Sequence, residues 1–284
     1  MSTSLTHTEG KKIAITGGTG TIGHALVQKI LEQYKGIEQI RIISRDEVKQ
    51  MQMMERFSYA SLLDFHLGDV RDLARMKELI AGMDLVIHAA ALKHVVMAEK
   101  NPSECFKTNV EGSENVIASC LAADVKRAIF ISTDKACKPV GVYGRSKKEA
   151  EELFLQAQEN GSTVFKTVRL GNIIGSRGSV FEVFERQRQS GVLTVSHPDA
   201  TRFCIEQEEA ASYVLYSLTN SQTGLLESPK MRAYSILEIA RQIAPDCEIV
   251  FSGLRPGDKL HEEIDGVSSA SALKRKGESM LAPH

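Results

Sequence analysis

The sequence lacks a charge excess, a long apolar run and a secretory signal. Its 35 Lys and Arg against 36 Asp and Glu give a formal net charge of -1, so electrostatics favours neither nucleic acid nor a membrane surface as a partner. No apolar run approaches the ~18 residues that a membrane span needs. The first ten residues, MSTSLTHTEG, lack the apolar core of a secretory signal, so 1–10 is predicted to be a short flexible leader.

Cysteines are few and scattered. The sequence has five of them, an odd number, and no two lie close together. A metal site needs clustered ligands and a disulfide scaffold needs denser cysteines, so the pattern predicts no metal and reduced thiols in a cytoplasmic protein. The remaining features are those of a globular chain. With 284 residues, 42% of them hydrophobic, it is long enough for one large α/β domain with a smaller lobe.

A glycine-rich loop near the start of the chain follows a predicted strand. The apolar run Lys11–Thr16 enters GGTGTIG, and a helical pattern continues through Ile22–Gln33. Glycines permit a tight turn and close backbone approach, and the free N–H groups of a helix start can hold a pyrophosphate. An ordinary βα turn is the alternative, but the flanking strand and helix favour dinucleotide binding. The expected contacts are Gly17, Thr19, Gly20, Thr21, Ile22 and Gly23.

The end of the second predicted strand bears on the choice between NAD and NADP. Gln39–Ile43 is followed by Ser44, Arg45 and Asp46. An acid directly at this strand end would bind the ribose 2′-OH of NAD, whereas an Arg accommodates the 2′-phosphate of NADP. Ser44 and Arg45 come first, which favours NADP, and Lys49 would add positive charge. Alternatively, Asp46 caps the next helix and Lys49 is a solvated surface lysine.

Two further strands end in segments predicted to line the cofactor. After the third strand, 62–68, an acidic and an apolar residue would lie beside the adenine. After the fourth, 84–88, three alanines would let the cofactor lie close to the backbone. An aspartate after the third strand, Asp69 or Asp72, would alternatively cap the next helix. The expected contacts are Asp69, Val70, Ala89, Ala90 and Ala91.

The stretch from Ile129 to Lys147 carries the main candidates for catalysis. Its apolar β-like run ends in the letters STDK, and after a Pro/Gly loop a Tyr and a Lys stand four residues apart at a predicted helix start. Open α/β sheets place ligands at such strand ends, and these side chains suit proton transfer. A surface ion pair is the alternative for the adjacent Asp and Lys. The candidate catalytic residues are Thr133, Asp134, Lys135, Tyr143 and Lys147, of which Tyr143 and Lys147 would also contact the cofactor.

Alternation of strands and helices predicts a doubly wound parallel sheet, hence an α/β, Rossmann-like NADP-binding domain over 11–172. Residues 173–264 are expected to form mainly a smaller substrate-binding lobe, with some segments returning to the sheet. Residues 265–284 have little apolar content and are predicted to be a mobile tail. Arginines in the later loops suit phosphate recognition, although each alone is more often a surface ion pair. The candidate substrate contacts are Lys93, Asn172, Arg177, Ser179, Arg202, Arg255 and Glu262.

Motifs along the chain resemble those of a known family. TGGTGTIG and Y-x-x-x-K fit the extended short-chain dehydrogenase/reductases, and SRDE, GDVRD, HAAALKHV, STDKA, TRF and RPGDKLHE follow in order. From about Lys11 to Ile264 the chain resembles the soluble UDP-N-acetylglucosamine 4,6-dehydratases of bacterial surface-sugar pathways. STDKA with HAAALKHV and RPGDKLHE separates this group from the dTDP-glucose dehydratases, whose acid pair is Asp-Glu. Tyr143 separates it from membrane-bound relatives that carry Met there.

The resemblance implies an internal redox elimination. Tyr143, its pKa lowered by Lys147 and the nicotinamide, would take the O4 proton while NADP accepts the C4 hydride, and Thr133 would bind the same oxygen. Lys135, made neutral by a depressed pKa, would take the C5 proton. Asp134, kept protonated, would give its proton to the departing C6 hydroxyl. The hydride returns to C6, so a tightly bound NADP is regenerated, and inversion at C5 is expected.

Two other functions remain open at this point. A nucleotide-sugar 4-epimerase on the same fold would need Tyr143 and Lys147 but no acid and base at Asp134 and Lys135. A non-catalytic NADP-binding regulator would need none of the four. Short-chain dehydrogenases commonly pair through the helices predicted at 102–122 and 143–158, so a homo-oligomer, a dimer or higher, is expected. Its partner would be a UDP-sugar, with neither nucleic acid nor a membrane involved.

Overall fold

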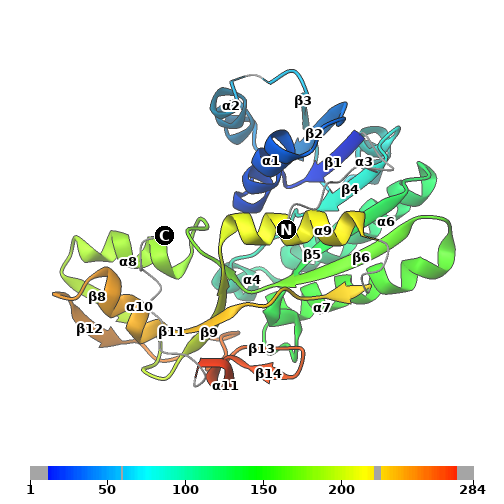
Figure 1. The fold of residues 1–284 in the computed structure, drawn as a ribbon. Coiled ribbons are helices and arrows are strands. Elements are labelled where there is room, and N and C mark those ends of the chain that lie inside the picture. Colours follow the sequence, from blue (N-terminus) through cyan, green and yellow to red (C-terminus); the bar gives the residue numbers. More distant parts are fainter. Residues whose placement is uncertain (1–11, 59, 221–224, 274–284) are drawn as a thin grey trace.

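A seven-stranded sheet forms the centre of the computed structural model, which describes residues 12–58, 60–220 and 225–273 (Figure 1). The strand order is β10-β6-β5-β4-β1-β2-β3, and all neighbours run parallel. Because the order reverses on the two sides of β1, the sheet is doubly wound. The predicted Rossmann-like α/β class is confirmed. The strands are β1 (Lys12–Thr16), β2 (Gln39–Ser44), β3 (Leu63–Leu67), β4 (Leu85–His88), β5 (Arg127–Thr133), β6 (Val164–Leu170) and β10 (Leu226–Glu227).

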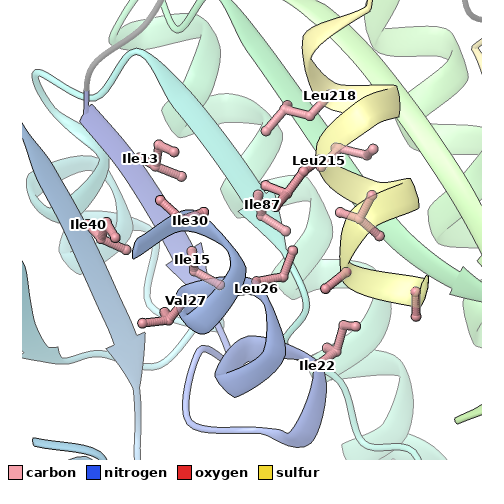
Figure 2. Packing of buried hydrophobic residues seen from close by; sticks show 14 of the residues in the cluster. Ile13, Ile15, Ile22, Leu26, Val27, Ile30, Ile40, Ile87, Leu215 and Leu218 are labelled. Atoms are coloured by element: carbon pink, nitrogen blue, oxygen red, sulfur yellow. The ribbon is translucent and has the colours of Figure 1, made fainter. Parts of the chain in front are cut away.

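Helices cover both faces of this sheet, so its strands are apolar on both sides. Successive residues of β1 show this, because Ile13 and Ile15 belong to one core cluster and Ala14 to the other. The first cluster lies under α1 and α9 (Figure 2), and the second includes residues of α3, α6 and α7. The helices around the sheet are α1 (Thr21–Gln33), α2 (Glu47–Arg56), α3 (Leu73–Ile80), α4 (Val95–Lys100), α7 (Val142–Gln156), which continues into η3 (Ala157–Asn160), and α9 (Gln207–Thr219).

Two aspartates begin helices, as the alternative interpretation of their positions proposed. The Asp46 carboxylate accepts a hydrogen bond from Lys49 N at 3.0 Å at the start of α2. Asp72 accepts from Arg75 N at 3.0 Å at the start of α3. Each carboxylate satisfies an N–H group that the first helical turn leaves without a partner.

The helix predicted over 102–122 is interrupted by a π-helical turn. It consists of α5 (Pro102–Phe106), η1 (Lys107–Glu111) and α6 (Gly112–Ala122). In the turn, the Asn109 side chain accepts from Leu92 N at 2.8 Å and donates to Leu92 O at 3.1 Å. It also donates to Ser146 Oγ at 2.9 Å. A π-turn often marks a functional position, and here it directs Asn109 between the segment after β4 and α7.

The second part of the chain builds smaller sheets around its own core. One sheet has the order β11-β9-β7, and β8 pairs with β12. Phe184, Leu193 and Ile239 are buried together in the core of this part. Two segments return to the large sheet, because α9 packs on α1 and β10 pairs with β6. The elements are β7 (Asn172–Ile173), α8 (Val180–Arg188), β8 (Val192–Val195), β9 (Thr201–Ile205), β11 (Arg232–Ser235), α10 (Ile236–Ile243) and β12 (Glu248–Phe251).

The prediction of a mobile tail over 265–284 is wrong for residues 265–273, which are ordered into secondary structure. β13 (Glu263–Ile264) and β14 (Val267–Ser268) form a hairpin, and α11 (Ser269–Leu273) follows. The low apolar content misled the prediction, because the packing here is polar. Ser269 is fully buried, and its Oγ lies 2.6 Å from Thr201 Oγ1 and 3.0 Å from Glu262 N. Residues 274–284 and the predicted leader lie outside the described residues. Across the residues that are described, no helix has the length and apolarity to span a bilayer.

Candidate active site

The glycine loop after β1 lies against the strand end of β4. Gly17 has a φ of 67°, and a Cβ there would come within 2.6 Å of Ala90 N. A Cβ on Gly23 would collide with the carbonyl of Gly18, so the helix could not approach the turn so closely. Gly20 is the N-cap of α1 and provides no side-chain cap. The first N–H groups of α1 are therefore available for an anion, next to the small residues after β4.

At the end of β2, charged side chains lie in ion pairs. Arg45 contacts Asp69 at 3.4 Å, and Lys49 contacts Asp46 at 2.5 Å. Arg71, which the sequence analysis did not select, binds Asp69 through Nε and Nη2, the shorter distance being 2.6 Å. The letters GDVRD were the available signal for Arg71. Among the other predicted contacts, Ser44 and Val70 are buried, and Ser44 Oγ accepts from Gln50 at 3.1 Å.

The carboxyl end of β5 continues directly into the short helix η2 (Asp134–Ala136). Thr133 Oγ1 donates to Asp134 Oδ1 at 3.0 Å, and Lys135 Nζ donates to the same oxygen at 3.0 Å. Lys135 Nζ also donates to Asn172 Oδ1 at 3.2 Å, so β7 brings a predicted substrate contact to the predicted base. Asp134 is 0% exposed. The surface ion pair considered above is thus excluded for Asp134.

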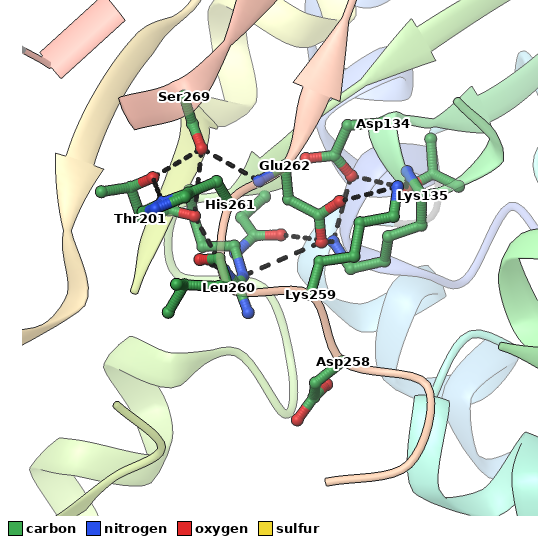
Figure 3. Close-up of polar contacts among 12 residues, drawn as sticks. Asp134, Lys135, Thr201, Asp258, Lys259, Leu260, His261, Glu262 and Ser269 are labelled. Carbon is green, nitrogen blue, oxygen red and sulfur yellow. Dashed lines mark hydrogen bonds and ion pairs between the residues drawn. The ribbon is translucent and has the colours of Figure 1, made fainter. Parts of the chain in front are cut away.

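A second carboxylate, Glu262, reaches this pair from the RPGDKLHE segment (Figure 3). Its Oε1 lies 3.3 Å from Lys135 Nζ and 3.9 Å from Arg202 Nε. Its Oε2 lies 3.5 Å from Lys259 Nζ, and Glu262 is 1% exposed. Lys259 was missed by the sequence analysis, although it stands inside the motif that supplied Glu262. The result is a cluster of two buried carboxylates and three cations, which we call the Lys135 cluster: Asp134, Lys135, Arg202, Lys259 and Glu262.

Burial and charge within the Lys135 cluster raise the pKa values of Asp134 and Lys135 and lower the pKa of Glu262. Burial raises the pKa of Asp134, and Glu262 adds to the rise against the opposing charge of Lys135. Burial alone would raise the pKa of Glu262, but Lys135, Arg202 and Lys259 outweigh it and lower that pKa. Burial would likewise lower the pKa of Lys135, but the two carboxylates outweigh it and raise that pKa. The predicted depression of the Lys135 pKa is therefore wrong for this structure.

The predicted effect of Lys147 on Tyr143 is also not observed. Burial raises the pKa of Tyr143 to about 12, and the influences that lower it are the charge of Lys135 and a hydrogen bond with Thr133. Lys147 reaches towards β5 instead, where its Nζ donates to Ile131 O at 2.6 Å and lies 3.8 Å from the centre of the Phe130 ring. Burial lowers the pKa of Lys147 to about 7. Spacing along the helix did not reveal this, because the direction of a long side chain depends on the strand beneath it.

The three predicted arginine contacts lie in three different settings. Arg202 belongs to the Lys135 cluster. Arg255 is exposed and contacts Asp258 at 3.0 Å. Arg177 N donates to Thr21 Oγ1 at 3.4 Å, and Arg177 O accepts from Lys93 Nζ at 3.0 Å. The loop that carries Arg177 therefore lies against the start of α1, next to the glycine loop.

Two smaller features complete the site. Ser179 is the N-cap of α8, and its Oγ is buried with no hydrogen-bond partner among the residues that the structure describes. Within the same residues, no group of three or more His, Cys, Asp or Glu side chains is arranged to hold a metal ion. The candidate site thus brings together groups that can exchange protons, from β5, α7 and the RPGDKLHE segment, beside a loop suited to a pyrophosphate.

Comparison with known proteins assigns the chain to a family. The family model described as "Polysaccharide biosynthesis protein" matches residues 13–282, so the chain belongs to this family. A UDP-N-acetylglucosamine 4,6-dehydratase (inverting) of Campylobacter jejuni is 42% identical over 258 residues, which are 89% of this chain and 77% of that protein. The resemblance inferred from the motifs is confirmed.

Two further comparisons bear on the fold and on the alternatives. A UDP-glucose 4-epimerase of Rickettsia conorii is 38% identical over 275 residues, 93% of this chain and 80% of that protein. The X-ray structure of Pen from Bacillus thuringiensis has a TM-score of 0.86 at 31% identity, covering 91% of this chain and 83% of its own. Relatives named for a dehydratase and for an epimerase thus share this architecture.

Proposed function

We propose that this chain is a nucleotide-sugar dehydratase that converts UDP-N-acetylglucosamine to a UDP-4-keto-6-deoxy-N-acetylhexosamine. The observation that carries the proposal is the buried contact of Asp134 with Lys135 at 3.0 Å, at the end of β5. An enzyme that only moves a hydride at C4 needs Tyr143 but has no use for this acid and base. The Campylobacter relative, named for the same reaction, supports the proposal at 42% identity.

A nicotinamide dinucleotide is the cofactor that the site fits. The uncapped start of α1 and the close approach of Gly17 to Ala90 support binding of its pyrophosphate there. When bound, it would accept a hydride from the sugar and return it within the same turnover. We infer NADP rather than NAD because Arg45, whose side chain is 55% exposed, stands at the end of β2. The proposed contacts remain those predicted from the sequence, with Arg71 as an addition.

The residues of the chain would divide the proton transfers among themselves. Tyr143 would take the O4 proton, and the charge of Lys135 and the hydrogen bond with Thr133 act against the rise of its pKa that burial causes. Lys135 would remove the C5 proton once it has lost its own. Asp134, whose raised pKa favours the protonated acid, would protonate the departing C6 hydroxyl. Asn172 is in place to orient Lys135.

Other parts of the proposal follow from the relatives and from the thiols. The word "inverting" in the name of the Campylobacter protein supports inversion at C5. All five cysteines are free, which supports a reducing, cytoplasmic location. A role in making surface sugars agrees with the family description.

The deciding experiment measures the mass and C5 configuration of the product formed from UDP-N-acetylglucosamine with NADP. A product lighter by one water, with inverted C5 by NMR, is expected. An isomer of unchanged mass would instead establish the 4-epimerase, the candidate that the Rickettsia relative favours. Tight NADP binding without turnover of any UDP- or dTDP-sugar would establish a non-catalytic regulator.

A further inference from the structure

The two carboxylates of the Lys135 cluster oppose the role proposed for Lys135 as a base, and the explanation that we give rests on the proposed function. A base at C5 has to be a neutral amine, yet Lys135 lies between two carboxylates. Its Nζ is 3.0 Å from Asp134 Oδ1 and 3.3 Å from Glu262 Oε1 (Figure 3). Two carboxylates at such distances favour the ammonium form of a lysine.

One proton transfer within the cluster removes the conflict. The ion pair of Asp134 carboxylate and Lys135 ammonium holds the same number of protons as the pair of Asp134 acid and Lys135 amine. The 3.0 Å hydrogen bond between Lys135 Nζ and Asp134 Oδ1 joins the two forms. An N–H bond of Lys135 breaks, an O–H bond of Asp134 forms, and the net charge stays the same. The second form is the one that the elimination requires.

The protons also balance over the turnover. Lys135 takes the C5 proton while the C–H electrons move towards the C4 carbonyl, and Asp134 gives its proton to the C6 hydroxyl, which leaves as water. These two transfers restore the ion pair. Lys135 later returns a proton to C5, which leaves the pair of Asp134 and Lys135 one proton short. The proton that Tyr143 took from O4 replaces it. No further acid or base is consumed.

The bonding of Glu262 leaves it able to change partners. Lys135 and Arg202 share its Oε1, at 3.3 and 3.9 Å, and Lys259 lies 3.5 Å from its Oε2. Oε2 is buried and has no hydrogen-bond partner among the described residues. A buried carboxylate oxygen without such a bond is costly. The 3.5 Å ion pair with Lys259 does not remove this cost, so a closer approach of Glu262 to Lys259 would be favourable.

We propose that Glu262 is a positioning residue that controls the proton transfer from Lys135 to Asp134. While Glu262 contacts Lys135, the ion pair persists. When the Glu262 carboxylate moves onto Lys259 and Arg202, Lys135 loses a counter-charge and its proton passes to Asp134. The RPGDKLHE segment thereby sets when the C5 base becomes active. The titratable and charged groups that act on Lys135 or feel its charge are Asp134, Tyr143, Arg202, Cys204, Lys259 and Glu262.

The test follows deuterium exchange at C5 of the bound sugar across pH. The active pair holds one proton, and its loss sets the alkaline limb of the profile. Glu262→Gln removes a negative charge that retains this proton, so the limb should move to lower pH by about one to three units. Lys259→Met removes a cation and leaves Glu262 on Lys135, so the limb should move to higher pH. A purely structural role would lower the rate at every pH without moving the limb.

A neighbouring carboxylate outside the cluster and a conservative substitution of Glu262 provide the controls. Glu263→Gln removes a carboxylate that pairs with Lys138 outside the cluster, and it should keep the wild-type limb. Glu262→Asp retains the charge and should return the limb towards the wild-type pH. An unmoved limb in both Glu262→Gln and Lys259→Met, or shifts of the same sign, would overturn the proposal. If Glu262→Gln does not fold, the Lys259→Met and Glu262→Asp profiles decide. A wild-type product without loss of water overturns the proposed function, and this inference with it.

Discussion

Lys147 is deeply buried, and burial of its positively charged form lowers the stability of the folded protein. The residue is 2% exposed, and its contacts are the carbonyl of Ile131 and the face of Phe130. Burial lowers its pKa to about 7, whereas an unfolded lysine titrates near ~10.4. Between these values the unfolded chain binds a proton that the folded chain does not. The contribution of Lys147 to the free energy of unfolding therefore rises with pH across that window and is least favourable below it.

Replacement of this lysine is expected to stabilise the protein while abolishing its activity. Lys147→Met should raise the Tm of the cofactor-free protein by roughly 3 °C or more at about pH 6. The gain over the wild type should shrink as the pH rises towards about 10. Thermal melting across pH, together with turnover, tests this. Lys148→Met, which changes a partly exposed neighbour, should show no such pH-dependent gain. A lower Tm for Lys147→Met at every pH would contradict the argument.

Arg45 offers a second test at the scale of one side chain. It stands at the end of β2 and contacts Asp69 at 3.4 Å, and a 2′-phosphate would give it a stronger, charge-assisted partner. Arg45→Ala should weaken NADP binding by roughly 10- to 100-fold, with little effect on NAD. Titration of both cofactors by calorimetry provides the measurement, and NAD is its internal control. An equal loss for the two cofactors would refute the assignment of the 2′-phosphate.

Among the elements, the start of α7 is held at a point where α4, α7 and the RPGDKLHE segment meet. Glu99 of α4 accepts a hydrogen bond from Val142 N at 2.6 Å, so its carboxylate caps the helix that carries Tyr143. Gly141 and Gly257 both lie against this carboxylate, because a Cβ on either would come within 2.8 Å of Glu99 Oε1. Gly257 belongs to the RPGDKLHE segment. The segment that brings Glu262 to Lys135 therefore packs against the start of α7.

A pair of glycine substitutions separates this contact from backbone strain. Gly257 and Gly253 both have positive φ, 83° and 78°. A Cβ on Gly257 would meet Glu99 Oε1 and Val95 Cγ1, whereas a Cβ on Gly253 would meet nothing within 4 Å. Gly253→Ala should cost about 1 kcal/mol in stability and leave turnover intact. Gly257→Ala should cost about 1–3 kcal/mol more and reduce turnover, because the cap on Val142 N is lost. Denaturant unfolding and turnover would detect this difference, and equal effects would dismiss the role of Glu99.

Local signals explain which elements could be predicted. The strands β1, β4 and β5 contain short apolar runs, and the glycine loop after β1 is recognisable from its own letters. In these places, neighbouring residues contain the information. The π-turn at Asn109 was missed because it depends on Leu92 and Ser146, which lie in other segments. The raised pKa of Lys135 was missed for the same reason. Its cause includes a carboxylate, Glu262, that only the tertiary fold brings within 3.3 Å.

At the scale of the whole molecule, oligomerisation is the remaining prediction. The α5–η1–α6 helix and α7 lie side by side on one face of the sheet, and they correspond to the helices through which related folds commonly pair. We expect a homodimer or a higher oligomer built on this face. Light scattering should therefore give a mass of at least twice the 31.2 kDa of one chain. A mass of one chain at micromolar concentration would contradict the prediction.

Strand β9 belongs to both parts of the molecule. Its last residue, Ile205, is buried in the core under α1 and α9, and its first residue, Thr201, contacts His261 and Ser269. Between them, Arg202 contacts Glu262. A recombination event inside this strand would therefore join half of one core to half of another. Exchange of the smaller lobe between relatives would have to preserve the contacts at both ends of this strand.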